Sequence, residues 1–241
     1  YGVDDPVATF ATLRGRLGLD WIQWDTNVGF AALQAAFPSG FKIEVIHPFE
    51  EERNPFMRRF LDRQGNAPHH LTFRLEGIEG YLERLAAIGV EPVAVRLDTP
   101  AWREAFVHAR GGIGILLQLA ESDNDKHTEP PETWTGVAPA DPVDFVRLEQ
   151  QVADVERAVE ILGAIDGVPV GEGSDEVGAF VDVAWGEGRI LRLRPDDSHP
   201  DGVHRCLVVD RVPAGDVQVS GPGSRTRLVV PELGAVIDAA S

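Results

Sequence analysis

Three side chains that can bind a metal ion stand in otherwise apolar, strand-like segments of this 241-residue sequence: Glu44, His70 and Gln118. Side chains in a strand alternate between its two faces, so each of the three faces away from the regular apolar face of its segment. Imidazole and carboxylate groups suit Zn, Ni, Co, Mn or Fe, and an amide oxygen is a neutral, weaker ligand. These residue types therefore favour a divalent metal that keeps positions open for substrate oxygens.

Each of the three residues also has an ordinary structural interpretation. A glutamate in a strand is usually an exposed side chain, and a single histidine is as often a hydrogen-bonded structural residue as a ligand. A glutamine on an apolar strand can simply hydrogen-bond within the core. The residues alone leave both interpretations open.

The candidate ligands belong to a unit that recurs along the chain, in which a strand leads into an amphipathic helix and then into two or three more strands. The clearest example is the strand His69–Leu75, followed by a helix from Ile78 to Ile88 that Gly89 ends. The other starting strands are Tyr1–Val3, Phe145–Val152 and His204–Val209, the last without an obvious helix after it.

The segments outside these units are also informative. Short helices are expected at Pro55–Asp62 and Leu233–Ala240, and the aperiodic stretch 122–141, rich in Pro, Glu, Thr and Asp, is typical of an interdomain linker. Tyr1–Val3 resembles the end of a strand, so we expect residues before Tyr1 in the native protein to supply its beginning.

Bulk properties exclude several classes of partner. The net charge of −17 argues against binding to nucleic acid or to an anionic membrane. Cys206 is the only cysteine, which excludes an intrachain disulfide and favours a reducing compartment. The sequence contains no apolar run near the ~20 residues that a spanning helix needs, and no signal segment opens it. We therefore expect a cytoplasmic protein.

Several segments together resemble the vicinal oxygen chelate superfamily (glyoxalase, bleomycin resistance and dioxygenase proteins): Lys42–Pro48, Phe60–Gly65, His69–Phe73 and Gly112–Leu119. Within it, the glyoxalase and methylmalonyl-CoA epimerase group is the most similar. The resemblance implies an α+β fold of paired βαβββ modules in two glyoxalase-like domains. We expect a first domain with a metal cup at 1–121, a linker at 122–141 and a degenerate second domain at 142–241.

The resemblance also implies roles for single residues. The family places one metal ligand in the first strand of each module and one in the last. By position, His70 and Gln118 are the ligands of the second module, where many members have Glu in place of Gln118. Glu44 is the closing ligand of the first module, whose other ligand would precede Tyr1. A chain without that residue lacks one ligand and can be empty of metal.

The second half of the chain does not repeat this ligand pattern. Arg147 occupies the first-strand position of the third module, and the closing position falls near Leu191 or Arg192. Only His204 matches a ligand position, and one histidine does not make a metal centre. This half is expected to serve as a cap, a dimer-like partner or a separate small-molecule pocket.

Three functions are compatible with this pattern. The first is a metal-dependent lyase or isomerase of the glyoxalase/epimerase type, acting on a small carbonyl substrate through a metal-bound enolate, with Glu44 as candidate base. The second is an iron-dependent dioxygenase of the same superfamily. The third is a metal-free binding or resistance protein. In each case we expect a small-molecule substrate or ligand, no nucleic acid and no membrane as partners, and we allow for a homodimer.

Overall fold

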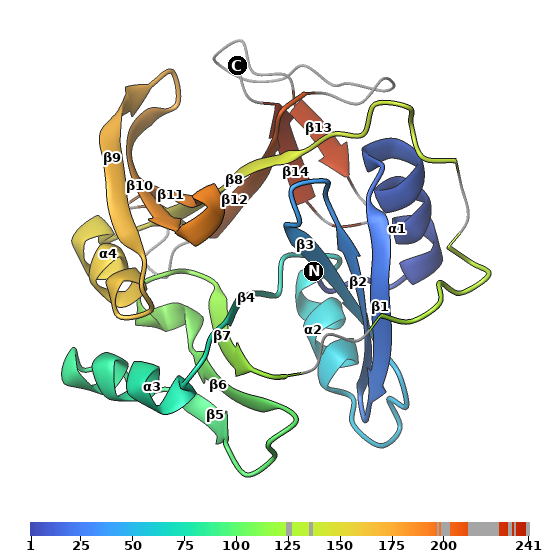
Figure 1. Ribbon diagram of the computed structural model, residues 1–241, viewed down its shortest axis with the longest axis horizontal. Helices are drawn as coiled ribbons and strands as arrows, with labels where there is room; N and C mark the ends of the chain where they lie inside the picture. Colours follow the sequence, from blue (N-terminus) through green and yellow to red (C-terminus); the bar gives the residue numbers. More distant parts are fainter. Residues whose placement is uncertain are drawn as a thin grey trace. The chain divides into compact units, whose positions relative to one another are not determined.

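The computed structural model describes residues 1–123, 127–134, 137–196, 198, 203–211, 227–230, 233 and 235–239. Within these residues the fold is α+β: short helices alternate with antiparallel and parallel strand pairs, as expected (Figure 1). No helix in the described part of the chain is long and apolar enough to cross a membrane.

The first module consists of α1, the π-helical turn η1, and strands β1, β2 and β3. Their bounds are Pro6–Thr12, Leu13–Leu17, Asp20–Asn27, Phe30–Ala36 and Lys42–His47. The helix begins at Asp5, whose carboxylate accepts hydrogen bonds from two backbone N–H groups of the first turn. The strands form an antiparallel sheet in the order β1-β2-β3, and Gly2 makes a parallel bridge to Ile46 of β3.

The second module contains β4, α3, β5, β6, the 3₁₀ turn η2 and β7. Their bounds are His70–Arg74, Ile78–Ala87, Val93–Arg96, Arg103–Val107, Ala109–Gly111 and Leu116–Glu121. The sheet has the order β4-β7-β6-β5, with β4 parallel to β7 and the other pairs antiparallel (Figure 1). The helix α2, Phe56–Gln64, lies in sequence between the first two modules.

The third module repeats this arrangement with β8, α4, β9, β10, the 3₁₀ turn η3 and β11. Their bounds are Phe145–Val152, Val155–Gly163, Val168–Asp175, Gly178–Trp185, Gly186–Gly188 and Arg189–Pro195. Strand β8 is parallel to β11, which continues into the antiparallel strands β10 and β9. The shared pattern, in which the first strand lies parallel to the last, confirms the βαβββ modules.

The last part of the chain contains a shorter version of the module. Strand β12, Val203–Val209, is parallel to β14, Ala235–Ala239, which is antiparallel to β13, Arg227–Val230. The expected C-terminal helix at Leu233–Ala240 is therefore wrong. Its apolar residues have helical spacing, but pairing with β12 and β13 satisfies the backbone of this segment as a strand, a non-local effect that periodicity does not reveal.

Contacts divide the chain into two compact units. Unit 1 comprises Tyr1–Pro68, Lys126–Val146 and Leu207–Ser241, and unit 2 comprises His69–Asp125 and Arg147–Cys206. These units group modules by contact and do not follow the boundaries expected at 121 and 142, which remain a prediction about where each domain begins and ends.

In unit 1, the segment expected to be a linker packs against the first module. The indole N–H of Trp21 donates to the carbonyl of Thr128 at 2.8 Å, and the ring of Trp134 lies 5.2 Å from Trp21 and 5.3 Å from Phe10. Further along, Gly18 ends η1 with a φ of 79°, and a Cβ on it would lie 2.5 Å from Pro142. These contacts attach the described part of the segment to the first module within unit 1.

In unit 2, the second and third modules share one packed interface. The rings of Phe73 and Trp185 lie 4.9 Å apart. The buried amide of Gln150 donates to the carbonyl of Ile113 at 2.6 Å, and Arg84 of α3 forms an ion pair with Asp166 at 2.7 Å. These contacts hold the two sheets and their helices together, so their polar faces can be compared directly.

Candidate functional site

The helix starts give a common reference for the first strands of the modules. Gly77 precedes α3 and Asp154 precedes α4 at the N-cap. His70 and Arg147 lie at the same distance in sequence before these caps, so they occupy the same position in the second and third modules. The corresponding position of the first module precedes Tyr1.

The pairing of the first strand with the closing strand identifies equivalent positions on the closing strands of the modules. Gln118 of β7 is paired with Thr72 of β4, and Arg192 of β11 is paired with Glu149 of β8. Glu44 of β3 lies two residues before Ile46, which bridges Gly2, and this places it at the matching position of the first module. The structure thus makes Glu44, Gln118 and Arg192 equivalent, and resolves the closing position of the third module as Arg192.

His70 stands at the start of β4, on the same strand face as Thr72. Its Nδ1 lies 2.8 Å from Nδ1 of His69, and the two rings are nearly perpendicular. Because Thr72 is paired with Gln118, His70 and Gln118 lie on the same face of two adjacent strands, two positions apart along the ladder. Such a diagonal pair is within reach of side chains as long as these.

Gln118 is almost fully buried, with 9% of its surface exposed, and both ends of its amide are bonded. The hydroxyl of Thr72 donates to Oε1 at 2.8 Å, and Nε2 donates to Oε2 of Glu104 at 2.8 Å. Glu104, 7% exposed, also accepts from the indole of Trp102 at 3.0 Å and lies 3.3 Å from Arg96. A row of polar contacts therefore crosses the sheet of the second module from β5 to β4.

Sequence reasoning missed Glu104. This residue lies in β6, which spans Arg103–Val107. The signal that was available is the alternation within this segment, which puts Glu104 on the same face as Phe106, the residue paired with Gln118.

Glu44 has a similar partner in unit 1. It is paired across the strands with Gln34 of β2, whose Nε2 donates to Oε2 of Glu44 at 2.7 Å. The oxygen of Gln34 in turn accepts from Nε2 of Gln23 at 3.3 Å. The carboxylate is half-buried and is held by an amide, as expected for a polar group on a largely apolar strand.

The residues fit a divalent metal in type, because they offer one imidazole, one carboxylate and one amide oxygen. His70 and Gln118 share a face within unit 2, whereas Glu44 belongs to unit 1, so the convergence of all three remains a prediction. Among the residues that the structure describes, no group of three or more His, Cys, Asp and Glu side chains could hold a metal ion by itself; Gln118 is of none of these types.

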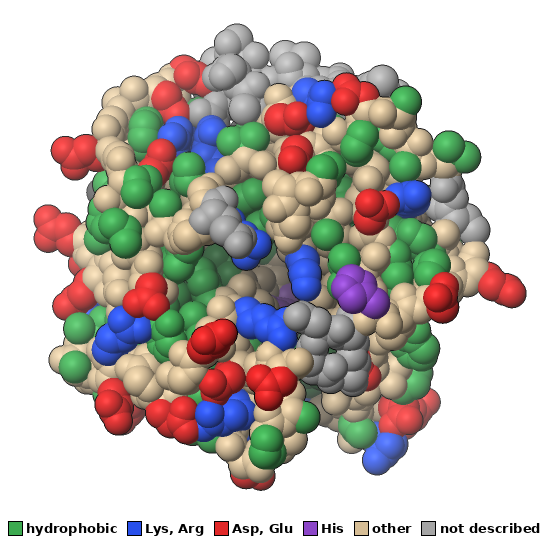
Figure 2. Space-filling view, in the orientation of Figure 1, with side chains coloured by type: hydrophobic (Ala, Val, Ile, Leu, Met, Phe, Trp, Pro, Cys, Tyr) green, Lys and Arg blue, Asp and Glu red, His purple; other side chains and the backbone are tan. Residues whose placement is uncertain are grey.

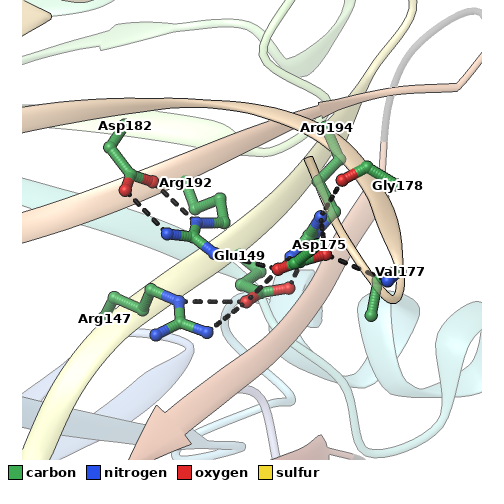
Figure 3. A network of polar contacts seen from close by, with 8 residues as sticks. All are labelled: Arg147, Glu149, Asp175, Val177, Gly178, Asp182, Arg192 and Arg194. Carbon is green, nitrogen blue, oxygen red and sulfur yellow. Dashed lines mark hydrogen bonds and ion pairs between the residues drawn. The ribbon is translucent and has the colours of Figure 1, made fainter. Parts of the chain in front are cut away.

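The third module carries an ion-pair cluster at the equivalent positions (Figure 3). Arg192 binds both oxygens of Asp182 at 2.7 Å, and Arg194 lies 2.9 Å from Glu149 and 2.8 Å from Asp175. The cluster also contains Arg147, which donates to Glu149 from two of its nitrogens. With three guanidinium groups and three carboxylates, its formal charges balance.

Burial makes this cluster electrostatically strong. The side chains of Glu149 and Arg194 are 1% and 4% exposed. Burial alone would raise the pKa of Glu149, but the hydrogen bonds and charges of Arg194 and Arg147 outweigh it and lower the pKa to about 2. The guanidinium of Arg192 also lies 3.6 Å from the ring centroid of Phe180.

On the surface, opposite charges are mixed. Acidic side chains are exposed over much of the face shown in Figure 2, and basic side chains lie beside many of them. Arg14 with Asp20 and Arg211 with Asp141 are examples of such exposed ion pairs. Surface pairs of this kind contribute little to stability, so the buried cluster of the third module stands apart from them.

The architecture defines an α+β protein of repeated βαβββ modules with ligand-type side chains on the first and closing strands. Residues 1–106 match the family model of the Glyoxalase/Bleomycin resistance protein/Dioxygenase superfamily, so this part of the chain is similar to that superfamily. The resemblance found in the sequence is thereby confirmed.

Individual proteins similar to this chain extend the comparison. The uncharacterized protein YqjC of Bacillus subtilis (strain 168) is 27% identical over 116 residues, which are 47% of this chain and 81% of that protein. A methylmalonyl-CoA epimerase from Mycobacterium tuberculosis is 25% identical, with a TM-score of 0.45 over 51% of this chain and 84% of that chain.

Two solved structures cover more of the chain. Catechol 2,3-dioxygenase has a TM-score of 0.59 at 14% identity, over 99% of this chain and 84% of its own. A triple mutant of 4-hydroxymandelate synthase from Streptomyces coelicolor also has a TM-score of 0.59, at 15% identity, over 86% of this chain and 68% of its own. At these identities the likeness shows a shared fold, which extends beyond residues 1–106.

Proposed function

We propose that this protein is a metal-dependent lyase or isomerase of the glyoxalase/epimerase type, which moves a proton next to the carbonyl group of a small substrate. The observation that carries the proposal is the positional equivalence of Glu44 and Gln118, together with His70 on the same face as Gln118. Two modules thus offer ligand-type side chains from matching strand positions.

In the proposed site, His70, Gln118 and Glu44 hold the metal and leave the remaining positions to substrate oxygens. When bound, a divalent metal supplies Lewis-acid stabilisation of the negative charge that develops beside a carbonyl. Gln118 would bind through Oε1, since its Nε2 is a donor that faces Glu104. An amide ligand leaves the site one unit more positive than a carboxylate would, which favours an anionic substrate state.

Glu44 is the proposed base. Gln34 donates to Oε2 of Glu44 and fixes the orientation of the carboxylate, while the apolar neighbours Ile43 and Val45 are buried on the other face of β3. A carboxylate held in this way can accept a proton from the carbon next to the substrate carbonyl and return it.

The test is Co²⁺ binding by the full-length protein, followed by isothermal titration and by the visible spectrum of the bound ion. His70→Ala is expected to weaken Co²⁺ binding at least about 100-fold, because it removes an imidazole ligand. His108→Ala is the control: His108 is an exposed histidine of the same module that caps η2 through its own ring nitrogen. Unchanged Co²⁺ binding by His70→Ala would overturn the proposal.

The native metal separates the alternatives. Iron in the purified protein, with oxygen consumption in the presence of a catechol-type or other aromatic substrate, would indicate the dioxygenase function instead. A wild-type protein that binds no divalent metal but retains a small aromatic ligand would indicate the metal-free binding function.

A further inference from the structure

In each of the first two modules, an amide on one strand is hydrogen-bonded to a carboxylate on its neighbour, and the residue types are exchanged between the closing strand and the strand before it. The two pairs differ in register: Gln34 lies directly opposite Glu44, whereas Glu104 is diagonal to Gln118, which lies opposite Phe106. In the first module the closing strand supplies the carboxylate, Glu44, and the preceding strand supplies the amide, Gln34. In the second module the closing strand supplies the amide, Gln118, and the preceding strand supplies the carboxylate, Glu104. In both, the amide nitrogen donates to the Oε2 atom of the carboxylate, at 2.7 and 2.8 Å.

The exchange has a consequence for Gln118. An ionised carboxylate only accepts hydrogen bonds, so Glu104 can face the NH₂ end of the amide but not its oxygen. With Nε2 directed at β6, Oε1 must point toward β4, where it accepts from Thr72. His70 lies on that strand and on that face.

Glu104 is itself held in place. Trp102 donates to the same carboxylate oxygen that Gln118 contacts, and Arg96 approaches the other oxygen. Its exposure of 7% leaves little room for the side chain to swing away. The orientation of the Gln118 amide is therefore fixed by a buried group that has its own partners on both sides.

We propose that Glu104 is a positioning residue, which turns the oxygen of Gln118 toward the His70 strand. We also propose that the diagonal Glu104–Gln118 pair links the strands of the second module as the directly opposed Gln34–Glu44 pair does in the first, with the residue types exchanged between strands. The effect on metal binding rests on the proposed function, whereas the exchange of residue types can be tested by stability alone.

The experiment compares Glu104→Gln, Gln118→Glu and the double variant that carries both. Glu104→Gln removes the acceptor-only partner, so the Gln118 amide can turn over, and the Kd for Co²⁺ is expected to rise about 10- to 100-fold. Gln118→Glu places two carboxylates side by side, and their repulsion is expected to lower the Tm by roughly 4–8 °C. The double variant restores one carboxylate and one amide, and should recover most of the Tm and bind Co²⁺ at least as tightly as the wild type.

Glu79→Gln is the matched control, because Glu79 is a glutamate of the same module whose ion pair with Arg103 lies at the surface. It should leave the Co²⁺ affinity unchanged. A double variant no more stable than Gln118→Glu would overturn the exchange, whether or not Co²⁺ binds. If the wild type binds Co²⁺ and His70→Ala abolishes binding, unchanged affinity in Glu104→Gln would overturn the positioning role alone. A wild type that binds no Co²⁺ contradicts the proposed function and, with it, the positioning role, but leaves the stability comparison decisive for the exchange.

Discussion

The second and third modules of unit 2 have the same strand order, the same parallel pairing and the same spacing between first strand and helix, yet their polar faces differ in kind. In the second module, Gln118 takes part in a row of contacts that joins one carboxylate, Glu104, to the hydroxyl of Thr72, the indole of Trp102 and the guanidinium of Arg96. In the third, Arg192 belongs to a cluster of three arginines and three acids (Figure 3). The backbone fixes the positions of these side chains. The residue types at those positions decide whether they can bind a ligand or only form ion pairs with one another.

The ion-pair cluster of the third module has a structural role, because its positive and negative charges balance one another. Every acid in it is bonded to at least one arginine, and the guanidinium groups of Arg192 and Arg194 are each shared between two carboxylates. A site whose charges are satisfied internally gains little from an added ion. The second module has no such internal cation at the position of His70.

The largest expected effect comes from breaking this cluster. Glu149→Gln leaves the buried guanidinium of Arg194 with less compensating charge, and the free energy of unfolding should fall by about 3–5 kcal/mol. Urea denaturation measures it. The control Glu160→Gln, in an exposed pair with Arg157, should change stability by less than about 0.5 kcal/mol. If both variants lose less than about 1 kcal/mol, the third module does not depend on its cluster.

The pH dependence sharpens the same comparison. The pKa of Glu149 is lowered from 4.5 to about 2 in the folded protein, so its stabilisation is complete above pH 4.5 and is lost as the pH falls toward 2. A shift of this size corresponds to about 3 kcal/mol, more than half of it lost by about pH 3. Urea denaturation of the wild type and of Glu149→Gln should give a difference that shrinks between about pH 6 and pH 3. A constant difference over this range would contradict the assignment.

A smaller effect is expected from replacing Phe180, the aromatic residue that packs against Arg192 of the cluster. Phe180→Leu keeps an apolar side chain on β10 but removes the ring face that lies 3.6 Å from the guanidinium carbon of Arg192. The expected loss of stability is about 1 kcal/mol, the size of a partly buried cation–π contact. Its dependence on the cluster can be checked in a double-mutant cycle with Asp182→Asn, because the two changes share Arg192 and should not be additive.

Local signals in the sequence were sufficient for the modules but not for the partners within them. The starting strand at Phe145–Val152 and the alternation around His70 were predicted correctly, because strand faces depend on neighbouring residues. Glu104 was missed because its contact with Gln118 depends on the pairing of β6 with β7. Asp175 and Asp182 meet the arginines of β11 only through strand pairing, which no local pattern specifies.

The smallest expected effect tests whether metal binding is confined to the first half of the chain. His204 lies in β12, the first strand of the shortened last module, just as His70 opens the second. If ligand residues in the first and closing strands are both required, His204→Ala should leave the Co²⁺ stoichiometry and affinity of the full-length protein unchanged, because this module offers no second matching ligand in the sequence. Titration of His204→Ala beside His70→Ala compares two histidines that open a module. A loss of bound Co²⁺ in His204→Ala would place a metal in the second half of the chain. It would then be wrong to distinguish modules that carry metal ligands from modules whose charged side chains pair with one another.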